Sequence, residues 1–303
     1  MSPDETAEGL PGDSARTQPS GRSPYLLLFI VIGSVYLCTF SDGYFGQIGD
    51  GLTMFNTAVS LHEFGELGIG PVFENGAMVR SDHYGKYGLG FPLVLQFPLL
   101  VAGPLEKALG QGRSNALFPL TNLLILAAVP ILIALCLRDL GFRLRTGLLA
   151  AAGFAFGTFA WPYISYDFSE PLQALCLTGA FWLLIRAARA DPPPRALLAL
   201  AGFALGLAVL TKATAVLLVP SYAIYLWTAM ERPRKTRLRR ALWFGAPLLI
   251  WGGAIALLNG HRFGSPFDFG YGAESTQFTT PLGSGLYGLW LGPNKGIIFY
   301  APL

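Results

Sequence analysis

The chain has 303 residues, of which 52% are hydrophobic and only 13% charged, and its mean hydropathy is +0.48. A soluble domain of this length carries about twice that share of charged residues, so the composition excludes a water-soluble globular fold. The net charge is +3, and the basic residues fall in short loops, which suits membrane orientation better than nucleic-acid binding.

The apolar residues form continuous blocks close to the roughly 20 residues that span a bilayer. A β-barrel would show alternation of polar and apolar residues instead. We therefore expect an all-α polytopic membrane protein. Three cysteines lie in or at apolar blocks without metal-ligand spacing, so neither a metal site nor a disulfide framework is indicated.

The N-terminal residues 1–23 are polar and rich in Pro, Gly and Ser, which predicts a disordered segment. The apolar run that follows has no small-residue cleavage pattern, so we interpret it as a retained first helix. We expect residues 24–303 to form one transmembrane domain. Because the sequence stops a few residues into a further apolar run, near Phe299, we also expect it to be part of a longer protein.

Seven of the apolar blocks are predicted to cross the membrane. Cytoplasmic loops carry the excess of Lys and Arg, so the clusters near Arg143, Arg189 and Arg237 should lie inside with the N-terminus. An eighth block, 89–105, cannot cross, because the cluster near Arg143 would then lie outside. Its three prolines also suit an interfacial or re-entrant segment. The predicted spans are 25–41, 115–137, 146–163, 170–189, 196–211, 213–230 and 241–258.

This topology makes residues 42–114 one long extracytoplasmic loop. Within it, residues 51–64 carry apolar side chains at helical spacing, which predicts an amphipathic helix on the membrane surface, ended by Gly65 and Gly68. Two spans are separated only by Lys212. A lysine at mid-bilayer is costly, so we place Lys212 at the outer tip of a helical hairpin.

Asp50 is the first candidate for chemistry, at the start of the amphipathic helix. Its structural interpretation is an N-cap that satisfies free backbone N–H groups. Its functional interpretation is a general base, since a carboxylate at a helix N-terminus stays ionised and can accept the proton of a substrate hydroxyl. Asp42 has the same chemistry, with a role in a turn as its alternative. Neither interpretation of Asp50 excludes the other.

Lys86 stands between Tyr84 and Tyr87 in a glycine-rich run. It can be an interfacial lysine flanked by membrane-belt tyrosines, or a cation for an anionic lipid headgroup such as a phosphate. Lys212 has the same two interpretations, and His83 could share the headgroup role. His83, Tyr84 and Tyr87 are candidates for the walls of a substrate cavity.

Asp167 and Glu170 lie where one predicted span ends outside and the next begins. The sequence Ser169-Glu170-Pro171 is also typical of a helix start, which gives Glu170 a structural alternative. Asp167 could line the same cavity as Asp50. No carboxylate spacing indicates a metal; a divalent ion is compatible with the sequence but not required by it.

Several sequence pieces, in this order, resemble the integral-membrane glycosyltransferases of the GT-C superfamily, close to family 39 and the protein mannosyltransferases. The resemblance covers residues from about 25 to the end. An Asp after the first span matches Asp50, and a Lys before a Gly- and Pro-containing apolar segment matches Lys86. Further matches are 168–171, 206–212, 262–266, 270–272 and Lys295-Gly296 with Tyr300. Relatives often carry Arg where this chain has Lys212.

The resemblance implies an inverting glycosyltransferase that moves a sugar from a polyprenyl-phosphate donor to a hydroxyl of a glycan, lipid or protein acceptor. It implies Asp50 as the base and Lys86, Lys212 and Arg262 as partners of the donor phosphate. The expected location is a bacterial inner or plasma membrane, with the site extracytoplasmic. A non-catalytic protein that binds or translocates lipids is the alternative, and it would need no general base.

Overall fold

The computed structural model describes residues 23–41, 49–69, 72–74, 77–79, 83–109, 117–190, 192–229, 234–277, 279–293 and 296–300. The predicted disordered segment at the N-terminus therefore lies outside the described residues, apart from Ser23, and so does Asp42. Within them the chain is all-α and polytopic, as predicted, apart from a hairpin of two short strands, β1 (Val72–Glu74) and β2 (Ala77–Val79).

Each predicted span corresponds to a helical element. The elements are α1 (Ser23–Thr39), α4 (Leu117–Asp139), α5 (Leu144–Gly157), α6 (Glu170–Arg189), α7 (Arg195–Thr211), η3 (Ala213–Leu218) with α8 (Val219–Thr228), and α9 (Arg234–Phe263). Among the described residues, α4, α6 and 236–263 of α9 are long and apolar enough to cross a membrane; α1, α5, α7 and the segment of η3 and α8 are shorter apolar helices.

Two predicted spans differ in detail from the helices observed. The block 146–163 stops being α-helical at Gly157, because the backbone becomes extended at Thr158, and it continues as a turn and the short helix η2 (Pro162–Ser165). The block 213–230 begins as a 3₁₀ helix and becomes α-helical near Pro220, a residue favoured in a first helical turn.

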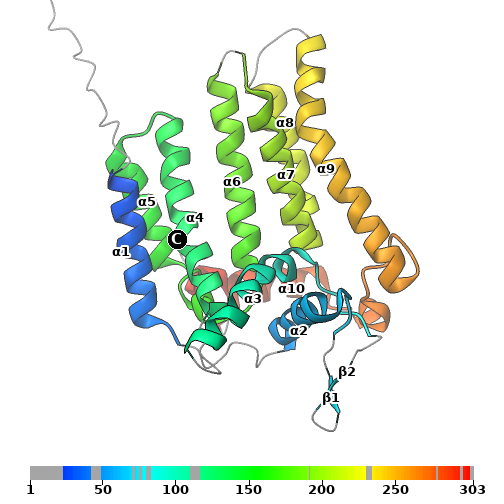
Figure 1. The fold of residues 1–303 in the computed structure, drawn as a ribbon. Helices are drawn as coiled ribbons and strands as arrows, with labels where there is room; N and C mark the ends of the chain where they lie inside the picture. The colour runs from blue at the N-terminus through cyan, green and yellow to red at the C-terminus, as the bar shows by residue number, and fades with distance from the viewer. Residues whose placement is uncertain are drawn as a thin grey trace, which may run out of the picture.

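The loop helices lie across one end of the bundle, at the bottom of Figure 1. They are α2 (Gly49–Phe64), which confirms the predicted amphipathic helix, and α3 (Gly90–Leu109), which does not run alongside the spans. Gly65 ends α2 with a positive φ of 70°, which a residue with a side chain adopts less readily. After α9 follow η4 (Gly272–Gln277), α10 (Leu282–Leu291) and α11 (Ile297–Tyr300).

Helices α7 and α9 approach each other closely through Gly202 and Gly206, which lie one turn apart. A Cβ on Gly202 would stand 1.9 Å from the carbonyl oxygen of Phe244, and one on Gly206 would stand 2.2 Å from the ring of Trp251. Small residues four apart let backbones meet in this way in membrane helices, where packing replaces the hydrophobic effect as the main source of association.

Apart from Arg262, the described arginines gather at the end of the bundle opposite the loop helices, where aromatic rings lie against several of them. The guanidinium of Arg138 lies 5.4 Å from the ring of Tyr25, and that of Arg195 lies 5.5 Å from the ring of Trp243. These contacts join α4 to α1 and α7 to α9, and a third, between Arg237 and Trp227, joins α9 to α8 at 5.4 Å. The bundle therefore has one basic end and one end that carries the loop helices.

Candidate functional site

A cavity of about 310 Å³ opens at the loop-helix end of the bundle. It is assembled from segments far apart in sequence: the first turn of α2, the loop before α3, the start of α6, the turn between α7 and η3, the end of α9 and the segment that follows it. Its charged lining residues are three carboxylates and three cations, namely Asp50, Glu170, Glu274, Lys86, Lys212 and Arg262.

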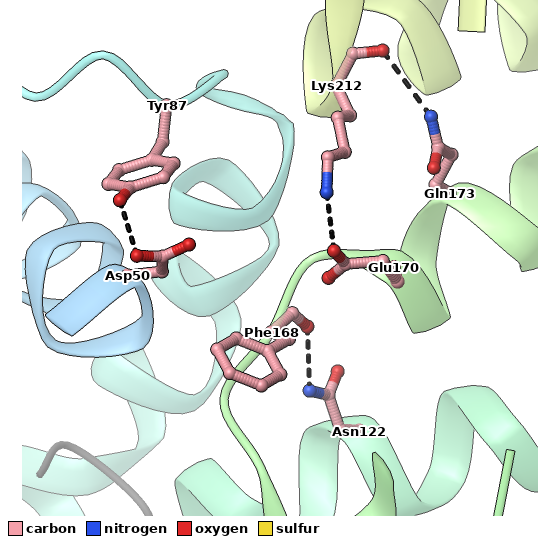
Figure 2. A network of polar contacts seen from close by, with 7 residues as sticks. All are labelled: Asp50, Tyr87, Asn122, Phe168, Glu170, Gln173 and Lys212. Carbon is pink, nitrogen blue, oxygen red and sulfur yellow. Dashed lines mark hydrogen bonds and ion pairs between the residues drawn. The ribbon is translucent and has the colours of Figure 1, made fainter. Parts of the chain in front are cut away.

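Asp50 lies in the first turn of α2, and its carboxylate accepts a hydrogen bond of 2.5 Å from the hydroxyl of Tyr87 (Figure 2). The N-cap alternative is therefore not the arrangement observed, although a negative charge in a first turn is still favoured by the helix dipole. Burial, followed by the hydrogen bond to Asp50 and its charge, raises the pKa of Tyr87 well above its usual value. Tyr87 thus stays a neutral hydrogen-bond donor.

Lys86 is held by a carboxylate and two aromatic rings. Its ammonium forms an ion pair with Glu274 and lies 5.4 Å from the centre of the Tyr271 ring and 5.8 Å from that of Tyr87. The hydrogen bond to Glu274 raises the pKa of Lys86 and, together with the charges of Glu274 and Asp50, outweighs the desolvation that lowers it. Lys86 is therefore a full positive charge at one side of the cavity.

Lys212 stands at the turn that ends α7, as predicted for the tip of the hairpin, and donates a hydrogen bond of 2.5 Å to Glu170 (Figure 2). Glu170 lies in the first turn of α6, where the helix dipole also stabilises its charge. The Gln173 side chain, one turn further along α6, donates to the backbone carbonyl of Lys212 at 3.4 Å. The second lysine of the cavity is thus positioned by α6.

Arg262, at the end of α9, binds the backbone of the loop that carries Lys86. Its Nη1 donates to the carbonyl oxygens of Gly85 at 3.2 Å and of Tyr87 at 3.0 Å, and its Nη2 donates to Asn259 at 3.0 Å. Arg262 is the one cavity cation for which the described residues show no carboxylate partner. Its Nε is buried without a hydrogen-bond partner there, so the guanidinium both positions the loop and keeps donor capacity.

The backbone that follows Tyr87 packs tightly against the end of α7. A Cβ on Gly88 would lie 2.1 Å from the carbonyl oxygen of Leu210, and one on Gly90 would lie 2.0 Å from the hydroxyl of Thr211. The end of α7 thus sets the position of the loop before α3. It also brings Lys212 to the same cavity as Lys86.

The remaining predicted cavity residues lie elsewhere. Asp167 is fully buried and packs against Gly51, whose Cβ would stand 1.9 Å from its Oδ1, so it supports the start of α2 from behind instead of lining the cavity. The carbonyl of His83 accepts a hydrogen bond from Ile69, and the ring of Tyr84 packs edge-on against His261 at 5.9 Å. Neither is among the lining residues.

Sequence reasoning missed Glu274 and Asn259. A signal for Glu274 existed, because it is the only carboxylate after residue 268 and follows the segment 270–272 that had been noted. No local sequence signal marked Asn259. It is buried on the apolar helix α9, and its side chain accepts a hydrogen bond from Arg262, one turn later. Within the described ranges, no group of three or more metal-ligating side chains is present.

The fold and the cavity define an integral membrane protein with a polar cavity at one end of a helical bundle. Residues 110–252 match the family model of dolichyl-phosphate-mannose-protein mannosyltransferase, which confirms the resemblance to the GT-C superfamily and implies a glycosyltransferase of that type. The matched part contains Glu170 and Lys212, whereas Asp50, Lys86 and Arg262 lie outside it. No curated protein and no solved structure matches the chain.

Proposed function

We propose that this protein is an inverting glycosyltransferase that uses a polyprenyl-phosphate-linked sugar and acts on the extracytoplasmic side of a bacterial membrane. The observation that carries the proposal is the cavity, because the Asp50 carboxylate and three cations line it together. The basic clusters at the opposite end of the bundle support the orientation, since cytoplasmic ends carry the excess of Lys and Arg.

In the proposed reaction the acceptor hydroxyl attacks the anomeric carbon of the donor from the face opposite the phosphate. The new bond joins the acceptor oxygen to that carbon, the bond from carbon to phosphate oxygen breaks, and the phosphate leaves with the electron pair. Asp50 takes the hydroxyl proton through Oδ2, because Oδ1 already accepts the hydrogen bond of Tyr87. The configuration at the anomeric carbon is therefore inverted.

The cations of the cavity stabilise the departing phosphate. Charge develops on the phosphate oxygen as the bond breaks, and ammonium groups fixed near that oxygen lower the barrier without reorganising. Lys86 is the principal partner in this proposal, with Lys212 on the other side of the cavity. Arg262 acts mainly by holding the carbonyl groups on both sides of Lys86.

The test compares wild type with Asp50→Asn in membranes of a strain that lacks the gene, supplied with radiolabelled polyprenyl-phosphate sugars. Loss of a general base lowers turnover by about 10²–10⁴-fold, so transfer by the variant should be near background. Glu63→Gln is the matched control, because Glu63 is an exposed carboxylate on the same helix outside the cavity. Normal transfer by Asp50→Asn would remove Asp50 from the mechanism. Background transfer by wild type itself, with lipid binding retained in Asp50→Asn and lost in Lys86→Ala, would instead favour the non-catalytic lipid-binding protein.

A further inference from the structure

Both lysines of the cavity form ion pairs with carboxylates. Lys86 pairs with Glu274, and Lys212 pairs with Glu170. A lipid phosphate that approaches these lysines must therefore compete with a carboxylate for the same ammonium group. The two pairs differ in how firmly the carboxylate is fixed.

Glu170 has structural reasons to stay where it is. It lies in the first turn of α6, a helix of 20 residues inside the bundle, where the dipole stabilises a negative charge. Glu274 lies in the six-residue η4, and its side chain is 54% exposed, against 37% for Glu170. A partly exposed ion pair contributes little free energy, so the pair of Lys86 and Glu274 separates easily.

Lys86 itself would stay in place if Glu274 moved away. Its ammonium lies near the rings of Tyr271 and Tyr87, and Arg262 holds the carbonyl groups of the residues on both sides of it. The lysine is thus fixed by contacts that do not involve the carboxylate. The exchangeable member of the pair is Glu274.

Resting on the proposed function, we infer that Glu274 is an exchangeable counter-ion that occupies the phosphate position on Lys86 and is displaced by the lipid phosphate. The displaced carboxylate stays close by and competes for Lys86 throughout the cycle. This matters most after transfer. The donor is a phosphodiester with one negative charge, whereas the departing lipid monophosphate carries about −1.5 to −2 and would otherwise remain on the lysine. Glu274 is therefore a specificity residue that limits affinity for the product.

The experiment measures the Kd of undecaprenyl monophosphate for the purified full chain in detergent. Glu274→Gln keeps the shape of the side chain but removes its charge, so binding should tighten by about two- to fivefold, the range that a partly exposed ion pair allows. Asp268→Asn is the matched control, because it removes a charge from the same segment, outside the cavity, and keeps an oxygen acceptor for Gly270. Its Kd should equal that of wild type.

A second measurement separates competition for Lys86 from general repulsion of the phosphate. In a Lys86→Met background, Glu274→Gln should have no effect, since no lysine remains to be released. Weaker or unchanged binding by Glu274→Gln alone, or a full effect in the Lys86→Met background, would overturn the inference and leave the proposed donor class standing. Failure of wild type to bind the lipid phosphate at all would overturn both.

Discussion

The contact between Gly88 and the end of α7 gives a prediction that tests the geometry of the cavity directly. In Gly88→Ala, the added methyl group would lie 2.1 Å from the carbonyl oxygen of Leu210 and 2.5 Å from that of Thr211. Both neighbours are backbone atoms in the last turn of a packed helix, so they cannot move aside as a flexible side chain does. The loop that carries Lys86 must retreat instead.

The size of the effect follows from these distances. Real Cβ contacts are essentially never closer than 3.0 Å, so the loop must retreat from Leu210 by about 0.9 Å. Overpacking of this kind costs about 1–3 kcal/mol of stability. A displacement of about 1 Å at positioning residues can lower turnover by about 100-fold. We expect a modest loss of stability in Gly88→Ala together with a large loss of transfer activity.

The assay measures transfer and the unfolding midpoint in detergent for Gly88→Ala beside Gly153→Ala. Gly153 lies inside α5 with nothing within 4 Å of its added Cβ, so alanine there should be neutral or stabilise by up to about 1 kcal/mol. The reasoning is refuted if Gly88→Ala keeps both the activity and the midpoint of wild type. It is also refuted if both glycine variants lose activity equally.

Two further predictions concern the fold and its orientation. Asn122 is fully buried and donates to the carbonyl oxygen of Phe168 at 2.9 Å, as Figure 2 shows, and to that of Tyr166 at 2.7 Å. Asn122→Leu should therefore lower the free energy of unfolding by roughly 1–3 kcal/mol, read from denaturation in detergent. The exposed residues Thr146 and Thr280 should lie on opposite sides of the membrane. A membrane-impermeant maleimide added to intact cells should therefore label Thr280→Cys and not Thr146→Cys. The reverse labelling pattern would contradict the proposed orientation.

The helices were predictable because their signals are local. Continuous apolar blocks placed most helices of the bundle within about two residues at each end, although α9 extends well beyond its block 241–258 at both ends. Apolar spacing with Gly65 gave both ends of α2. The end of α5 was placed too late, since hydropathy runs on to Tyr163 while the backbone becomes extended at Thr158, directly after Gly157. Hydropathy measures burial in lipid and does not detect a change of backbone geometry inside an apolar block.

The site was predictable as a set of residue types and not as a set of contacts. Asp50 and Lys86 could be chosen because polar groups beside a membrane need a reason to be there, and both line the cavity. Asp167 is also a carboxylate, yet it packs behind α2, against Gly51. Its position in the sequence does not indicate which side of α2 it contacts. Glu274 is 188 residues from its partner Lys86, and only the fold brings them together.

The contacts that join neighbouring helices differ between the two ends of the bundle. At the basic end, cation–π pairs such as that of Arg138 with Tyr25 join neighbouring helices through groups that no substrate displaces. At the other end, the parts of the cavity are joined by ion pairs and hydrogen bonds to the same side chains that would bind the ligand. If the cavity takes a lipid-linked donor, as proposed, we expect a long lipid chain to enter by parting the helix ends around the cavity, with the basic end as the fixed end.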